Sequence, residues 1–143
     1  MKSLTVSEID LLLSAYDSSP TECDGMTRLC HTLLYQVKVP HQVKCGVARS
    51  GDKLLPLHFW TNLTEHLQGY RVDYRLQMWF GRSAEVPHGI FLSKKFSLVE
   101  YEGFCLELEP LPETILQALQ FGIEIELLPW EAMKKAVTSE HLV

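Results

Sequence analysis

The chain has 143 residues, of which 46% are hydrophobic and 22% charged, and its formal net charge is −5 at pH 7. This length and composition predict one folded domain over residues 1–143 and exclude a disordered chain. The acidic balance argues against a nucleic-acid partner, because phosphate binding requires clustered Lys and Arg. Every apolar run is far shorter than a membrane-spanning helix, so no membrane partner is expected either.

Two helices are expected in the N-terminal part of the chain. The segment Thr5-Val6-Ser7-Glu8 has the pattern of a capping box and predicts a helix over residues 6–17, which the turn at Pro20 ends. A second helix is expected from Cys23 or Asp24 to just before Val39-Pro40, because apolar residues recur there at helical spacing. Its apolar stripe consists of Met26, Leu29, Cys30, Leu33, Leu34 and Val37.

After Pro40 the apolar residues alternate with polar ones, which is typical of strands. The expected elements are strands over residues 43–47, 54–62, 69–76 and 96–108, a turn at 50–53 and a polar loop at 81–89. Beyond them we expect a helix over 112–121, a strand over 123–127 and a terminal helix over 129–137. This order predicts an α+β fold, with N-terminal helices packed on a mainly antiparallel β-sheet.

The chain contains four cysteines, and none of them belongs to a Cys-x-x-Cys pair. That spacing argues against a zinc ribbon, and we expect no metal and no other cofactor. The N-terminal stretch contains Glu8 and Asp10 and therefore lacks the uninterrupted apolar core of a signal peptide. We expect free thiols in a cytoplasmic protein, which leaves open whether one of them is reactive.

Cys23 is the thiol best placed to react, because it lies at the expected start of the second helix. Unpaired N–H groups and the helix dipole favour a thiolate at such a position. Cys23 also lies three residues before Met26, so its sulfur is expected to face the sheet. The flanking acidic residues Glu22 and Asp24 oppose ionisation, and a thiolate would therefore need a nearby imidazolium.

His58 and Asp73 are the expected partners of this thiol. A four-residue loop at 64–67 would place the two residues directly opposite each other on neighbouring strands, and a change of two residues in loop length would make the pairing diagonal. Asp73 would then hold one ring nitrogen of His58 and leave the other for the thiol. Trp60 would lie on the same face and form a wall of the site. The alternative for Asp73 is a surface salt bridge with Arg71 or Arg75, which lie on the same face of its strand.

Residues 23–76 resemble the core of the transglutaminase-like cysteine proteins, within the papain-like superfamily. The resemblance rests on Cys23 at a helix start, the step Val39-Pro40, the triplet His58-Phe59-Trp60 in one strand and Asp73 in the next. It implies a catalytic triad of Cys23, His58 and Asp73 in a thiol-dependent acyl-transfer enzyme. The implied substrate is a peptide or another amide, with hydrolysis as the default outcome.

The chain departs from this family upstream of the thiol. Family members often have a Gln or an aromatic group there that stabilises the oxyanion; no Gln precedes Cys23, and Tyr16 is the nearest aromatic candidate. Glu22 stands where a small residue is common. His88, in the polar loop, is a candidate for the border of the cleft, with a role in a turn as its alternative. These departures leave open a catalytically inactive binding or scaffold domain that retains the fold.

The remaining cysteines and two histidines have simpler expected roles. Cys30 and Cys45 follow apolar patterns and are expected in the core, and Cys105 is expected to be structural in a late strand. His31 lies off the apolar stripe of its helix and His41 follows a proline, so both are expected to be solvated.

Overall fold

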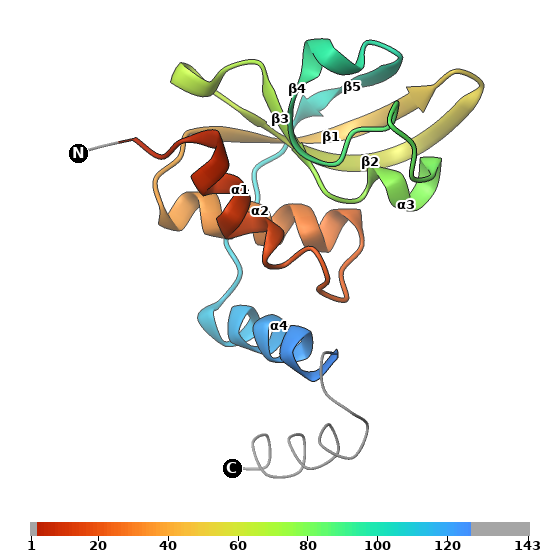
Figure 1. Ribbon diagram of the computed structural model, residues 1–143. Coiled ribbons are helices and arrows are strands. Elements are labelled where there is room, and N and C mark those ends of the chain that lie inside the picture. Colours follow the sequence, from red (N-terminus) through yellow and green to blue (C-terminus); the bar gives the residue numbers. More distant parts are fainter. Residues whose placement is uncertain (1–2, 127–143) are drawn as a thin grey trace.

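A computed structural model describes residues 3–126 and has an α+β fold (Figure 1). Five antiparallel strands form one sheet in the order β4-β3-β2-β1-β5, and the N-terminal helices α1 and α2 pack on one side of it. The predicted fold class is therefore confirmed at this level. The strands are β1 (His41–Ser50), β2 (Lys53–Leu63), β3 (Tyr70–Asp73), β4 (Gly89–Leu92) and β5 (Val99–Cys105).

The first two helices form where the local sequence predicts them. Helix α1 (Val6–Ser14) begins with the expected capping box, in which Thr5 Oγ1 accepts from the N–H of Glu8 and Glu8 Oε1 accepts from the N–H of Thr5. It ends three residues earlier than expected, because the chain continues in turns from residue 15. Helix α2 spans Cys23–Gln36, so the predicted start at Cys23 is correct.

The main core lies between these helices and the sheet. The buried side chains of α2 include the predicted apolar stripe except Val37, which follows the helix and is exposed, and they also include Thr27 and Thr32. Each fully buried Leu stabilises the fold by about 1.5–3 kcal/mol. The main cluster consists of Ile9, Leu13, Met26, Leu29, Cys30, Leu33, Leu34, Val39, Leu63, Val72, Tyr74 and Leu116. A second cluster consists of Ala48, Leu76, Phe80, Val86 and Val99.

The strand expected over residues 69–76 ends at Asp73 and is followed by helix α3 (Leu76–Phe80). The reason is a side-chain interaction: Asp73 Oδ1 accepts from the N–H groups of Arg75 and Leu76, both at 3.0 Å. An Asp that binds the backbone two and three residues later turns the chain out of the sheet.

Two further differences concern the second half of the chain. Strand β4 was not predicted, and the expected strand over 96–108 is confined to β5. The predicted strand over 123–127 is wrong for residues 123–126, because helix α4 (Glu113–Glu126) continues over them. Residue 127 lies outside the described residues. The alternation there is short, and it follows a stretch rich in helix-forming Leu, Gln and Ala. The expected helix over 129–137 lies outside the described residues.

Strands β1 and β5 come unusually close together where two glycines face each other. Gly46 is paired with Gly103 across these strands. A Cβ atom on Gly46 would collide with the carbonyl oxygen of Glu102, and one on Gly103 would collide with that of Cys45. On its other side Gly46 is paired with His58 of β2, so this close approach occurs beside the predicted site.

His31 and His41 are only partly exposed, and their ring nitrogens contact protein atoms, so the prediction that both are solvated holds only in part. Their rings contact each other, with His31 Nδ1 at 2.7 Å from His41 Nε2. His31 Nε2 lies 2.9 Å from the carbonyl oxygen of Leu108, and His41 Nδ1 lies 2.7 Å from that of Val39. The two rings thus connect α2, β1 and the segment after β5, a tertiary arrangement that the pattern of one helix does not reveal.

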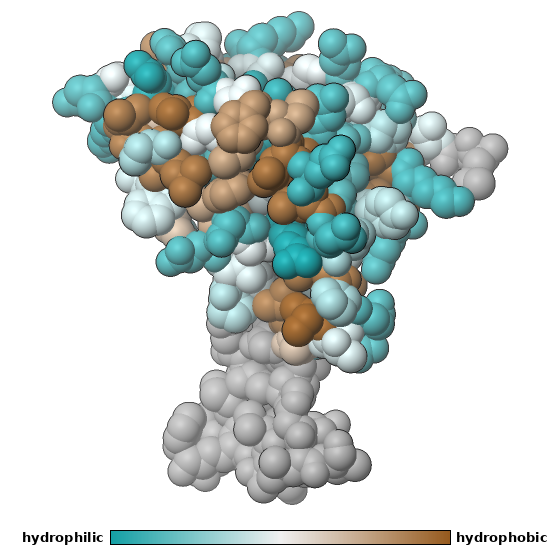
Figure 2. Space-filling view, turned by 180° about the vertical axis from the view of Figure 1, so that it is seen from behind, coloured by the Kyte–Doolittle hydropathy of each residue, from teal (hydrophilic) through white to brown (hydrophobic). Residues whose placement is uncertain are grey.

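The surface mixes polar and apolar side chains, and Figure 2 shows apolar groups separated by hydrophilic ones on one face. Among residues 3–126, no helix has the length and apolar character that crossing a bilayer would require.

Candidate active site

Cys23 is the first residue of α2 and is partly exposed. The residue before it, Glu22, caps the helix only with its backbone, because its side chain makes no capping hydrogen bond. The N–H groups of the first turn therefore remain available for a negative charge close to the thiol.

His58 and Asp73 form a hydrogen-bonded pair in the interior. His58 Nε2 lies 2.6 Å from Asp73 Oδ2, and the side chains are 0% and 1% exposed. The second oxygen of Asp73 accepts the two backbone N–H groups that end β3, which fixes the orientation of the carboxylate. This burial excludes the alternative in which Asp73 accepts a surface salt bridge.

The predicted strand register was wrong by two residues, although the two side chains meet. Strand β2 pairs with β3 through Thr61 and Val72, rather than through His58 and Asp73. The connection between the strands takes up residues 64–69, which is two residues more than expected. His58 therefore reaches Asp73 diagonally, a separation that a long ring side chain can span.

A fourth side chain, Tyr101 of β5, completes the surroundings of Asp73. Its hydroxyl donates a hydrogen bond of 2.8 Å to Asp73 Oδ2. Burial above all, and then the carboxylate of Asp73, raise the pKa of Tyr101, so the hydroxyl keeps its proton and acts as the donor. With the contacts of His58 and the two backbone N–H groups, the carboxylate accepts four hydrogen bonds.

The environment of His58 raises its pKa to about 9. Burial alone would lower this pKa, but the hydrogen bond to Asp73 and the neighbouring Cys23 side chain outweigh that effect. His58 Nδ1 is buried and has no hydrogen-bond partner of standard geometry within the described part of the chain. The structure thus brings the three predicted residues together, with one ring nitrogen of His58 held by Asp73 and the other without a hydrogen-bond partner in the described part of the chain.

Trp60 lies in the interior beside His58, whereas Tyr16 lies at the edge of the main core. Trp60 is 2% exposed, and its ring contacts two others, with centroids 6.1 Å from that of His58 and 5.0 Å from that of Tyr101. It forms an inner wall behind His58 that solvent does not reach. Tyr16 is half-buried and packs against the main core just after α1.

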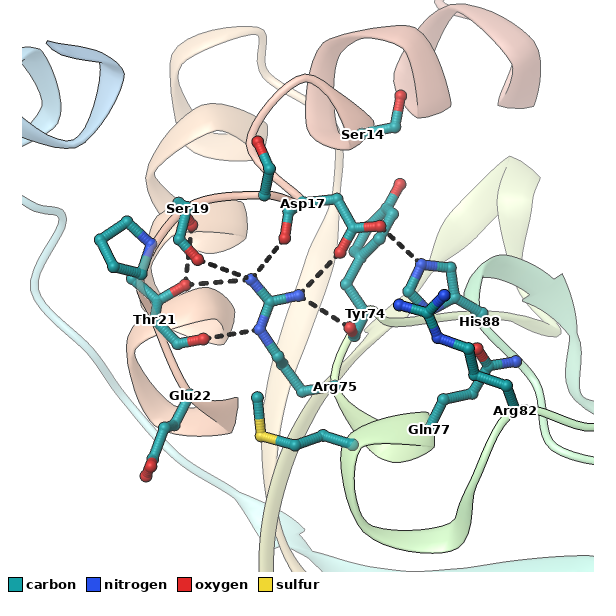
Figure 3. A pocket seen from close by; sticks show the side chains of 13 residues that line it. Ser14, Asp17, Ser19, Thr21, Glu22, Tyr74, Arg75, Gln77, Arg82 and His88 are labelled. Atoms are coloured by element: carbon teal, nitrogen blue, oxygen red, sulfur yellow. Dashed lines mark hydrogen bonds and ion pairs between the residues drawn. The ribbon is translucent and has the colours of Figure 1, made fainter. Parts of the chain in front are cut away.

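His88 lines a surface hollow of about 880 Å³ next to the start of α2 (Figure 3). Its Nε2 donates to Asp17 Oδ2 at 2.7 Å, and its ring packs edge-on against Tyr74. Glu22, the neighbour of Cys23, and Arg75, two residues after Asp73, also line this hollow. The hollow is therefore bounded by residues adjacent in sequence to two members of the candidate triad.

The other cysteines differ from Cys23 in burial. Cys30 is 2% exposed, and burial above all raises its pKa to about 12, as expected of a core thiol. Cys45 is also buried, and its pKa is raised by burial first and then by the nearby charge of Cys23. Cys105 is exposed, with Lys44 Nζ at 3.7 Å from its sulfur. All four thiols are free, and residues 3–126 contain no cluster of three side chains that could hold a metal ion.

Sequence reasoning missed Tyr101 and Arg75. Tyr101 lies far along the chain from the other site residues, and no spacing rule connects it to Asp73. Arg75 was considered only as a surface partner of Asp73, whereas it is 6% exposed and its guanidinium is directed toward the turn before α2 (Figure 3).

Comparisons of the chain with protein-family models, with curated proteins and with solved structures found no match.

Replacing Tyr101 by Phe is expected to reduce the free energy of unfolding by about 1.5–3 kcal/mol, the usual contribution of a hydrogen bond to a buried charge. The ring and its packing against Trp60 would remain, so the loss reports on the hydroxyl. Urea denaturation measures this loss of stability. Tyr35→Phe is the control, since Tyr35 is 64% exposed. Equal stabilities of the two variants would contradict the contribution assigned to the Tyr101–Asp73 bond.

Proposed function

We propose that this chain is a thiol-dependent acyl-transfer enzyme with a transglutaminase-like, papain-type core. Cys23 would be the nucleophile, His58 the general base and acid, and Asp73 the group that orients His58. The observation that carries the proposal is the buried 2.6 Å contact between His58 and Asp73, beside a thiol at a helix N-terminus. A thiol-bearing helix packed on an antiparallel sheet that carries His and Asp also supports it.

In the proposed reaction the Cys23 thiolate attacks the carbonyl carbon of an amide or ester. The protonated His58 then donates its proton to the leaving amine or alcohol, which leaves a thioester on Cys23. Water attacks this thioester while His58 accepts one of its protons, and the C–S bond breaks to give a carboxylic acid and the regenerated Cys23 thiolate beside protonated His58. Asp73 keeps the imidazole in place and stabilises its cationic form in both steps.

The start of α2 would serve the oxyanion of the tetrahedral intermediates. The backbone N–H of Cys23 is one donor at this position, and the helix dipole adds to its effect. Since Glu22 does not cap the helix with its side chain, a substrate oxygen would not have to displace a carboxylate.

The proposal is tested by the rate at which iodoacetamide labels Cys23 as a function of pH. An ordinary thiol is less than about 1% ionised at pH 6, whereas a thiolate paired with imidazolium reacts well below pH 8. Peptide mass spectrometry resolves the cysteines, so the exposed Cys105 is an internal control. We expect Cys23 to be labelled about 10-fold or more faster than Cys105 at pH 6.

The variant His58→Ala removes the proposed partner of the thiolate, and its Cys23 is expected to show the pH profile of an ordinary thiol. An ordinary profile at Cys23 in the unsubstituted protein would contradict the proposal. It would favour the alternative, a catalytically inactive binding or scaffold domain that retains the fold.

A further inference from the structure

The guanidinium of Arg75 holds the turn that leads into Cys23 (Figure 3). Arg75 is 6% exposed and lies between β3 and α3. Its Nε donates to the carbonyl oxygen of Thr21 at 2.6 Å, and its Nη2 donates to those of Asp17 and Ser19 at 2.8 and 3.3 Å. One side chain thus binds three carbonyl groups of the segment between α1 and α2.

This segment has little structure of its own. Residues 15–22 form turns and bends between the two helices, and regular secondary structure resumes at Cys23. Local N–H groups already bind the carbonyl oxygens of Tyr16 and Ser19, whereas the carbonyl oxygens of Asp17 and Thr21 accept from Arg75. The planar fork of an arginine can bind several such groups at once. A lysine in the same place would offer a single point charge on a flexible stem.

The backbone of Arg75 is bound to the other half of the site. Its N–H donates to Asp73 Oδ1 at 3.0 Å, on the carboxylate that holds His58. Arg75 therefore connects Asp73, through its main chain, with the turn before Cys23, through its side chain.

The charge of Arg75 is compensated locally, so its effect on Cys23 is one of position. Nη1 donates to Asp17 Oδ1 at 2.7 Å. Burial alone would raise the pKa of Asp17, but His88 and Arg75 together lower it, which keeps this carboxylate charged. The guanidinium and the carboxylate form a pair whose combined field at the thiol is small compared with that of a lone cation.

We infer that Arg75 is a positioning residue, which places the nucleophile Cys23 against His58 by holding the turn at residues 17–21. The inference rests on the proposed function. It assigns the alignment of the two halves of the site to one side chain that touches neither the substrate nor the reacting atoms.

The test compares Arg75→Lys and Arg75→Ala with Arg82→Ala, whose exposed arginine lines the same hollow. The iodoacetamide rate at Cys23 is measured from pH 5 to 9, and labelling of the buried Cys30 reports unfolding. Misplacement by about 1 Å can lower a rate by about 10²-fold. We expect such a loss at pH 6 in both Arg75 variants, with no labelling of Cys30 and no change in Arg82→Ala.

Chemical rescue tests whether Arg75 acts on Cys23 by holding the turn or by its charge. The hollow opens onto Arg75, so guanidinium ion added at millimolar concentration is expected to restore the Cys23 rate of Arg75→Ala, whereas methylammonium is not. A Cys23 profile in Arg75→Lys equal to that of the unsubstituted protein would overturn the inference, as would a loss accompanied by labelling of Cys30. An ordinary profile in the unsubstituted protein would instead overturn the proposed function itself.

Discussion

Replacing Asp73 by Asn is expected to lower the rate of the proposed acyl transfer by about 10²- to 10⁴-fold, the usual contribution of positioned acid–base catalysis. The amide can accept hydrogen bonds but carries no charge to stabilise the His58 cation. Burial lowers the pKa of His58 and only Cys23 would remain to raise it, so without the carboxylate this pKa is expected to fall well below about 9. A smaller fraction of His58 would then be imidazolium at neutral pH.

The same substitution is expected to change how stability depends on pH. In the unsubstituted protein the pKa of His58 is raised from 6.5 to about 9 on folding, so its protonated form adds stability below about pH 6.5. That contribution is lost as the pH rises through about 9. In Asp73→Asn the pKa of His58 is expected to be lower in the folded protein, so the loss of stability between pH 6.5 and 9 should be smaller than in the unsubstituted protein.

Urea denaturation at several pH values and NMR titration of the His58 ring measure these effects. Asp52→Asn is the matched control, because Asp52 lies exposed in the turn between β1 and β2. A His58 pKa that stays near 9 in Asp73→Asn would contradict the role given to this carboxylate.

Replacing Trp60 by Ala is expected to lower the free energy of unfolding by about 3–5 kcal/mol. The ring is 2% exposed and packs against both His58 and Tyr101, so its removal leaves a cavity that these neighbours cannot fill without moving. The substitution acts on the inner wall of the candidate site, and the loss of stability should be accompanied by greater exposure of His58.

The control for Trp60 is a second tryptophan, Trp79 in α3, which is 50% exposed. Trp79→Ala is expected to change stability by no more than about 0.5 kcal/mol, as is usual for surface positions. Urea denaturation of both variants makes the comparison. Similar losses in the two would mean that Trp60 is not part of the well-packed interior.

The parts of the site that depend on local pattern could be predicted from the sequence. The start of α2 at Cys23 follows from the apolar stripe, and the hairpin of β1 and β2 follows from alternation and the turn. His58 and Asp73 are in contact although the predicted register differs from the observed one by two residues, because diagonal neighbours on adjacent strands still lie within reach.

The parts that depend on contacts between distant segments could not be predicted. Tyr101 and Arg75 reach the site from elements whose relative placement no periodicity encodes. Helix α3 replaces the end of a predicted strand because the Asp73 side chain binds the backbone. Strand β4 has four residues, too few for alternation to distinguish it from a loop.

The facing glycines of β1 and β5 bear on whether another chain with this arrangement can form the same site. Because a side chain at Gly46 or Gly103 would push the strands apart, β5 can approach closely enough to bring Tyr101 to Asp73 only while both positions stay bare. A chain with equivalents of Cys23, His58 and Asp73 but a bulkier residue at either position would hold its carboxylate by fewer bonds. The two glycines lie outside the chemistry proposed for Cys23, His58 and Asp73, yet the space they leave between the strands allows the fourth hydrogen bond to the carboxylate.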